Sequence, residues 1–98
     1  MNRLGYVYII QSEKTRRYYI GSTINVSRRL IEHNSGETAS IKRDIPWTLK
    51  LVKSYDTIAQ ARRVEFKIKQ LKRRDYIERM IIEADIKIVA RPDVTSGK

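Results

Sequence analysis

Residues 5–11 read GYVYIIQ and residues 17–22 read RYYIGS, and these two tyrosine-rich segments decide the fold of the chain. Both are rich in the β-branched and aromatic side chains that strands favour. The first segment is apolar on both faces, which predicts a central, covered strand. The polar stretch between them has the length of a hairpin connection, so we expect the second strand to run antiparallel to the first.

Tyr8 and Tyr19 lie on these two strands, and they fall close to opposite one another if the turn centres near residues 13–14. Whether both side chains point to one face depends on a one-residue register that the sequence leaves open. Gly21 follows on the same side of its strand as Tyr19. A glycine weakens a strand unless a bulge or a closely approaching group needs the space. Ordinary packing of two strand aromatics is the alternative interpretation.

The segment after the hairpin predicts a helix, a loop and a third strand. Asn25 can cap a helix that runs to about Asn34, and the Ser-Gly pair at residues 35–36 ends it. Residues 35–46 are typical of a loop, and residues 47–55 (WTLKLVKSY) of a strand.

Two further helices complete the pattern. Asp56 or Thr57 can cap the first, from about residue 58 to residue 72, and Asp75 starts the second, which ends near residue 84. The buried stripe of the first is expected to hold Val64, Ile68 and Leu71. The order β-β-α-β-α-α predicts an α+β fold, a small three-stranded and mainly antiparallel sheet flanked by helices.

Length and composition suit one compact domain of 98 residues with a modest core, 41% of the residues being apolar. We expect the domain to span residues 1–84, followed by a C-terminal tail, residues 85–98, that is frayed from residue 91. No apolar run approaches the roughly 18–20 residues that a membrane span needs. The N-terminus lacks the features of a secretion signal, so we expect a cytoplasmic protein with no membrane contact.

Charge is the first indication of function, because 21 Lys and Arg residues face 11 Asp and Glu residues, a formal net charge of +10. Such a field attracts polyanions and raises their encounter rate, which favours contact with nucleic acid. A solvated surface or a ribosome-associated protein is the alternative. The chain has no cysteine and a single histidine, which excludes disulfides, thiolate zinc sites, cysteine nucleophiles and histidine-rich metal sites.

The helix after the hairpin carries candidate polar groups beside its apolar face. Val26, Leu30 and His33 share the face that should meet the sheet, and Arg29 lies at its edge. Arg29 and His33 are one turn apart and can address one group at the edge of the core. Arginine suits phosphate because its planar fork donates two hydrogen bonds and keeps its charge. A satisfied residue at the core edge is the alternative role for His33.

Glu65 is the only acidic residue between Arg62 and Arg74, a stretch crowded with lysine and arginine. One interpretation is an ion pair with Lys69 at i,i+4, which is common and contributes little. The other is a lone carboxylate that holds Mg²⁺, since hard cations prefer oxygen ligands and phosphate oxygens can complete the shell.

Taken together, these residues resemble the GIY-YIG nuclease superfamily over roughly residues 5–83. The first motif is present as Tyr6-Val7-Tyr8 and the second as Tyr19-Ile20-Gly21, with the two motif tyrosines eleven residues apart. Arg29 follows Tyr19 by ten residues and His33 comes four later, as on the family's helix. Glu65 matches the acidic metal ligand by order and context. The chain is most similar to small stand-alone bacterial members, relatives of the nuclease domain of the excision-repair subunit UvrC.

The resemblance implies a metal-dependent endonuclease that hydrolyses DNA phosphodiester bonds in repair, recombination or processing. It implies that Glu65 binds one Mg²⁺ or Mn²⁺ ion. It also implies that Arg29 neutralises the negative charge that develops on the non-bridging phosphate oxygens. Tyr8 would take or relay the proton of the attacking water, and Tyr19 would position that water. An isolated tyrosine has a pKa near 10. We expect Arg29, the metal and His33 each to favour the phenolate of Tyr8.

Four basic residues are expected to hold the nucleic acid, namely Lys67, Lys69, Lys72 and Arg73. Branched or structured DNA suits a stand-alone domain of this size, and a protein partner could supply targeting. The family often carries an asparagine late in the domain, whereas this chain has none after Asn34. That departure favours an alternative, a nucleic-acid-binding module with the nuclease fold and little catalysis. A basic RNA- or ribosome-associated protein is a third possibility.

Overall fold

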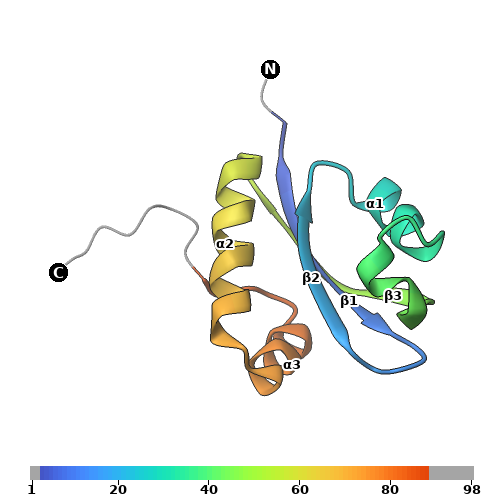
Figure 1. Ribbon diagram of the computed structural model, residues 1–98. Helices are drawn as coiled ribbons and strands as arrows, with labels where there is room; N and C mark the ends of the chain where they lie inside the picture. Colours follow the sequence, from blue (N-terminus) through green and yellow to red (C-terminus); the bar gives the residue numbers. More distant parts are fainter. Residues whose placement is uncertain (1–2, 89–98) are drawn as a thin grey trace, which may run out of the picture.

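The computed structural model describes residues 3–88 and shows one three-stranded sheet with helices on both faces (Figure 1). The elements in chain order are β1 (Gly5–Ser12), β2 (Tyr18–Thr23), α1 (Val26–Asn34), the 3₁₀ helix η1 (Ala39–Asp44), β3 (Trp47–Tyr55), α2 (Ile58–Leu71) and α3 (Arg74–Glu83). The sheet order is β2-β1-β3, and both pairings are antiparallel. The predicted α+β fold is therefore confirmed, with a fully antiparallel sheet and one added 3₁₀ helix.

The central strand β1 is covered on both faces, as its apolar pattern predicts. Val7 and Ile9 have no exposed surface and belong to the core that α2 covers. Tyr8 and Ile10 belong to a second core on the opposite face, beside α1 and η1. Because side chains alternate along a strand, one strand supplies both cores.

Helices α1 and α2 begin at polar side chains that accept otherwise unpaired backbone N–H groups. The Asn25 side chain accepts a hydrogen bond of 3.0 Å from the backbone N–H of Arg28, which confirms Asn25 as the cap of α1. At α2, Thr57 and Gln60 form a reciprocal capping box. Of the two caps that the sequence allowed for α2, Thr57 is the one used.

The predicted loop at residues 35–46 is wrong in part, because it contains η1. Ile41 and Asp44 of this short helix are buried, and the Asp44 backbone carbonyl accepts a 2.6 Å hydrogen bond from Ser12 Oγ. A six-residue helix is too short for apolar periodicity to reveal it. Its folding depends on the contact with the end of β1, which is a tertiary feature.

The stripe of α2 differs from the prediction at its end. Val64 and Ile68 are buried, whereas Leu71 is 42% exposed and lines a groove with Tyr76 and Ile88. Leu71 has the helical phase of the stripe, but it is the last residue of α2, where the backbone turns away. Ala61 is fully buried on the same face instead.

Packing continues past α3, since Ile86 has no exposed surface and its carbonyl accepts a 2.7 Å hydrogen bond from Lys53 Nζ. Residues 91–98, which are expected to fray, lie outside the described residues. Within residues 3–88, no helix combines the length and apolar character needed to cross a membrane.

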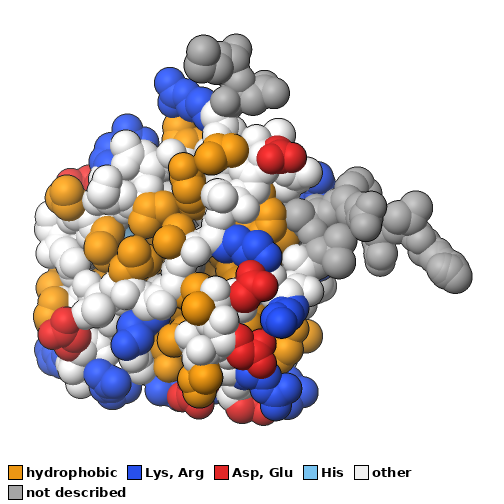
Figure 2. Space-filling model, turned by 180° about the vertical axis from the view of Figure 1, so that it is seen from behind, with side chains coloured by type: hydrophobic (Ala, Val, Ile, Leu, Met, Phe, Trp, Pro, Cys, Tyr) orange, Lys and Arg blue, Asp and Glu red, His pale blue; other side chains and the backbone are white. Residues whose placement is uncertain are grey.

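A groove stays open beside the N-terminal half of α1. It is lined by apolar side chains that include Leu30 of α1 and Tyr6, Leu49 and Val52 of the sheet. In the view from behind, apolar side chains gather in patches on the surface (Figure 2). The nine residues of α1 span roughly 14 Å, whereas the nine residues of β3 span roughly 30 Å, so α1 cannot cover this face alone.

We predict that Gly5→Ala destabilises the protein by about 1–3 kcal/mol. A Cβ atom at position 5 would lie 2.5 Å from the Cα of Ile58 and 2.6 Å from the carbonyl oxygen of Thr57. Both atoms are backbone, so the start of α2 would have to move away from β1. Urea denaturation measures the change, with Ser54→Ala on β3 as control. An unchanged midpoint would show that α2 does not pack this closely.

Candidate active site

Tyr8 and Tyr19 lie on the same face of the sheet, so the structure settles the register that the sequence left open. Tyr8 pairs with Gly21 and Tyr19 pairs with Ile10, which makes the two tyrosines diagonal neighbours. Their ring centroids are 6.4 Å apart. Both rings face the layer that contains α1 and η1.

Gly21 provides the space that the Tyr8 ring occupies. A Cβ atom at position 21 would lie 2.3 Å from Tyr8 Oη and 2.5 Å from its Cζ. Real Cβ atoms do not approach other heavy atoms so closely, and a ring carbon cannot give way without the whole side chain moving. The expectation that a closely approaching group explains this strand glycine is therefore confirmed.

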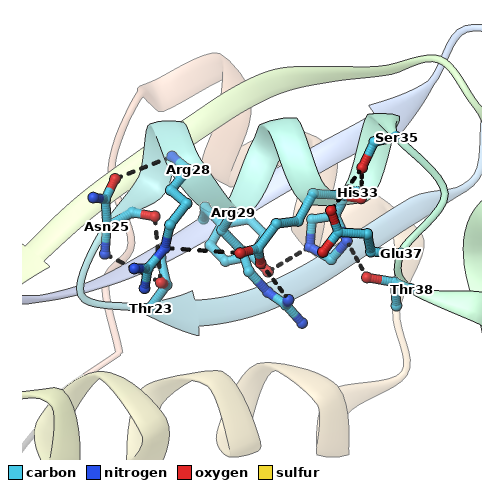
Figure 3. Close-up of polar contacts among 10 residues, drawn as sticks. Thr23, Asn25, Arg28, Arg29, His33, Ser35, Glu37 and Thr38 are labelled. Atoms are coloured by element: carbon cyan, nitrogen blue, oxygen red, sulfur yellow. Dashed lines mark hydrogen bonds and ion pairs between the residues drawn. The ribbon is translucent and has the colours of Figure 1, made fainter.

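His33 reaches the two tyrosines from α1. It is fully buried, as its place on the apolar face predicts, and its Nε2 atom lies 2.8 Å from Tyr8 Oη. Its Nδ1 atom lies 3.0 Å from Thr38 Oγ1, a contact visible in Figure 3. The centroid of the Tyr19 ring is 5.1 Å from that of His33, in an edge-on arrangement.

Burial keeps both members of the Tyr8–His33 pair neutral. Burial raises the pKa of Tyr8 to about 12, and a hydrogen bond from the Arg29 guanidinium only partly opposes this rise. Burial also lowers the pKa of His33, and the nearby positive charge of Arg29 lowers it further. Arg29 lowers the pKa of Tyr8, as predicted, but loss of hydration on burial raises it by more, so the phenol stays protonated.

Arg29 connects this buried pair to solvent. Its side chain is 37% exposed, and Nη1 donates a 2.9 Å hydrogen bond to Glu32 Oε1. That contact with Glu32 raises the pKa of Arg29, so the guanidinium is charged throughout the physiological range. The Arg29 fork can therefore present a positive charge beside Tyr8 to an incoming anion.

Glu65 approaches the same region from α2. Its Oε1 atom accepts a hydrogen bond of 2.5 Å from Ser22 Oγ, and its Oε2 atom lies 2.7 Å from Lys69 Nζ. The Lys69 ammonium also lies over the Tyr19 ring, 5.6 Å from the centroid. The predicted ion pair between Glu65 and Lys69 is thus present on the α2 face of the edge strand β2, and Lys69 reaches Tyr19 past that edge.

The donor set around Glu65 fits a single hard cation. Residues 3–88 contain no group of three or more His, Cys, Asp or Glu side chains that could hold a metal ion. Glu65 with the adjacent Ser22 hydroxyl leaves most coordination positions for water and substrate oxygens, which suits Mg²⁺ or Mn²⁺. The ammonium of Lys69 already marks a favourable position for positive charge beside Glu65 Oε2.

The four predicted nucleic-acid ligands do not all lie together. Lys69, Lys72 and Arg73 line one groove at the junction of α2 and α3, next to Tyr18 of β2. Lys67 lines a different groove on α2, shared with Tyr76 of α3. A single strand that follows the first groove from Glu65 would therefore meet Lys69, Lys72 and Arg73 but not Lys67.

Four of the five candidate catalytic residues lie together on the α1 face of the sheet, namely Tyr8, Tyr19, Arg29 and His33. Glu65 lies across the edge strand β2, and its charge acts on Tyr8 from there. The family model of the GIY-YIG catalytic domain matches residues 4–79. The chain belongs to the GIY-YIG family. This membership confirms the resemblance that the tyrosine motifs indicated.

This GIY-YIG domain is similar to two UPF0213 proteins. Over 70 residues it is 44% identical to a UPF0213 protein of Halobacterium salinarum, a match that covers 69% of this chain and 88% of that protein. It is also similar to the solution NMR structure of the UPF0213 protein BH0048 from Bacillus halodurans, with a TM-score of 0.52 and 29% identity. That match covers 83% of this chain and 86% of the other. The GIY-YIG domain is therefore homologous to UPF0213 proteins.

Three contacts of the GIY-YIG site were not predicted. Ser22 donates a hydrogen bond to Glu65, and Arg29 donates one to Glu32. Thr38 forms a hydrogen bond with the ring of His33. The contact of Ser22 with α2 could have been predicted from the sequence. Side chains alternate along a strand, so the residue after Gly21 must point to the opposite face, where α2 packs. Thr38 lies in an irregular segment, whose path cannot be obtained from periodicity.

We predict that Gly21→Ala displaces the Tyr8 ring and destabilises the protein by about 1–3 kcal/mol. A double-mutant cycle with Tyr8→Ala measures whether the two positions interact. In the Tyr8→Ala background the added methyl group has room, so its cost should largely disappear. Equal costs in both backgrounds would refute the proposed overlap.

We also predict that lowering the pH toward 5.5 destabilises the protein through His33. Its pKa is lowered from 6.5 in the folded state, so the unfolded chain binds more protons below about pH 6.5 and is favoured. His33 is the only histidine in the sequence, so one side chain dominates this pH window. The urea midpoint should fall from pH 7.5 to pH 5.5, and His33→Gln should remove most of that fall. The same fall in both proteins would contradict the assignment.

Proposed function

We propose that this protein is a metal-dependent endonuclease that hydrolyses DNA phosphodiester bonds. The observation that carries the proposal is the convergence on Tyr8 of a neutral imidazole and a charged guanidinium, with a carboxylate close by. Membership of a family defined by its catalytic domain supports the same conclusion. Phosphodiester hydrolysis needs these functions, namely a proton acceptor for water and positive charge at the phosphate.

Tyr8 and His33 form the proposed proton path. Because Arg29 donates to the phenol oxygen, the phenol proton is directed to His33 Nε2, 2.8 Å away. The Nδ1–H group of that tautomer can donate to Thr38 Oγ1, which fixes the ring. Tyr8 can then accept a proton from the attacking water while its own proton passes to His33. A relay of this kind avoids a free phenolate, which the raised pKa of Tyr8 disfavours.

The remaining site residues act on the phosphate and the water in this proposal. Arg29 neutralises the charge that develops on the non-bridging oxygens, and Tyr19 positions the attacking water beside Tyr8. Glu65, oriented by Ser22, would hold one Mg²⁺ or Mn²⁺ ion. When bound, that ion supplies Lewis-acid polarisation of the phosphate and stabilises the leaving oxygen.

The substrate class follows from charge and from the basic groove at the junction of α2 and α3. A net charge of +10 favours a polyanion, and Lys72 and Arg73 extend the positive surface away from Glu65. We propose DNA, including branched or structured DNA, in repair, recombination or processing. A protein partner could direct so small a domain to its sites.

We predict that the purified protein nicks supercoiled DNA in Mg²⁺ or Mn²⁺ and that EDTA stops the reaction. Tyr8→Phe and Glu65→Ala should each lower the rate by at least about a hundredfold, because they remove the proton relay and the metal ligand. Glu83→Ala is the matched control, since it removes an exposed carboxylate that pairs with Lys87, at the end of α3.

The outcomes separate this proposal from its alternatives. Equal rates in EDTA, or with Glu65→Ala, would exclude the one-metal scheme. Binding of DNA without cleavage in either metal would favour a nucleic-acid-binding module that retains the fold, as the missing late asparagine does. Preferential binding of structured RNA would favour an RNA-associated role.

A further inference from the structure

Both oxygens of the Glu65 carboxylate are already occupied by side chains of the protein. Ser22 Oγ donates to Oε1, and the Lys69 ammonium lies 2.7 Å from Oε2. The Glu65 side chain is only 20% exposed, so it has little freedom to turn away from these partners. A divalent cation that uses Glu65 must therefore compete with Lys69 for Oε2.

Electrostatic repulsion prevents the Lys69 ammonium and a metal ion from contacting this oxygen at the same time. Mg²⁺ binds a carboxylate oxygen at about 2.0–2.1 Å and holds a rigid octahedral shell. An ammonium beside the same oxygen would lie within a few ångströms of the dication, where like charges repel strongly. Binding of the ion at Oε2 therefore requires the Lys69 ammonium to leave.

The exposure of the Lys69 side chain allows its ammonium to leave Glu65. Its side chain is 48% exposed and ends over the Tyr19 ring, which lies next to the proposed position of the scissile phosphate. Lys72 and Arg73 line the same groove and would bring a DNA backbone close to it. A phosphate oxygen is thus the nearest alternative partner for the ammonium once DNA is bound.

We propose that Lys69 is an exchange residue, which pairs with Glu65 in the DNA-free protein and moves to a substrate phosphate when DNA binds. The inference rests on the proposed function, because it takes Glu65 as the metal ligand. Its consequence is that DNA and the divalent ion bind cooperatively. By linkage, each ligand then raises the affinity for the other by the same factor. The two interpretations of Glu65, ion pair and metal ligand, describe successive states of one side chain.

The test is a titration of the DNA-free protein with Mn²⁺, in which electron paramagnetic resonance measures the concentration of the free ion. Lys69→Met keeps the length of the side chain and removes its charge. Loss of the ion pair alone should tighten Mn²⁺ binding by up to about fivefold, and loss of the repulsion should add to this. Lys72→Met is the matched control, since it removes the same charge three residues away, and it should change the affinity by less than about twofold.

A second experiment measures how much bound DNA changes the affinity for Mn²⁺. It uses the Tyr8→Phe background, in which the DNA is expected to stay uncut. DNA should tighten Mn²⁺ binding clearly when Lys69 is present and much less in the Lys69→Met protein. Circular dichroism and thermal melting establish that the variants are folded, and Lys69→Gln serves as a second neutral variant.

The outcomes distinguish failure of this inference from failure of the proposed function. If Mn²⁺ binds equally well to Glu65→Ala, Glu65 is not the metal ligand, and both ideas fail. If Mn²⁺ binding requires Glu65 but Lys69→Met and Lys69→Gln bind no more tightly than the unmodified protein, only the exchange is overturned. Tighter binding by the Lys69 variants, together with weaker coupling to DNA, supports the exchange.

Discussion

The burial of β1 on both faces is the constraint on which the rest of the structure depends. Val7 and Ile9 fill the core beneath α2, and the alternate residues Tyr8 and Ile10 must then fill the core on the other face. A phenol placed in this position loses water and has to find its partners inside the protein. Gly21 leaves room for the ring, and His33 supplies the hydrogen bond. The site is therefore part of a hydrophobic core.

The same burial gives the site its electrostatic character. Loss of hydration disfavours both a charged Tyr8 and a charged His33, so the pair is neutral and joined by one hydrogen bond. Charged side chains lie at the rim of the site, among them Arg29 on α1 and Glu65 on α2, each paired with an oppositely charged neighbour. In the proposed reaction, an incoming phosphate therefore meets a charged guanidinium, while the groups that move protons are neutral before the reaction. Such separation suits a site in which the substrate supplies most of the negative charge.

Sequence patterns predicted the elements well and the contacts between them poorly, for physical reasons. The strand Trp47–Tyr55 was predicted with its observed bounds, because propensity and flanking turn residues agree there. The motif spacing selected five candidate residues that come from distant parts of the chain, since a family pattern already contains tertiary information. Periodicity could not supply the hairpin register, the helix η1 or the partner Thr38, because each depends on distant packing. The effect of Arg29 on the pKa of Tyr8 has the predicted direction, but the sequence does not show how much more strongly burial opposes the phenolate.

In the proposed function, a strongly basic protein uses the single carboxylate of Glu65 to bind a metal ion. With a net charge of +10, the free protein repels a divalent cation, and one carboxylate paired with Lys69 offers it little compensation. In the proposed complex, a bound DNA backbone reduces the repulsion, because its phosphates neutralise the basic groove. It also frees the Glu65 carboxylate, because the phosphates offer Lys69 another partner. The negative charge that completes a metal site then comes with the substrate. In the proposed function, the small number of acidic ligands therefore makes metal binding weak without DNA and tighter when there is a phosphodiester to cut.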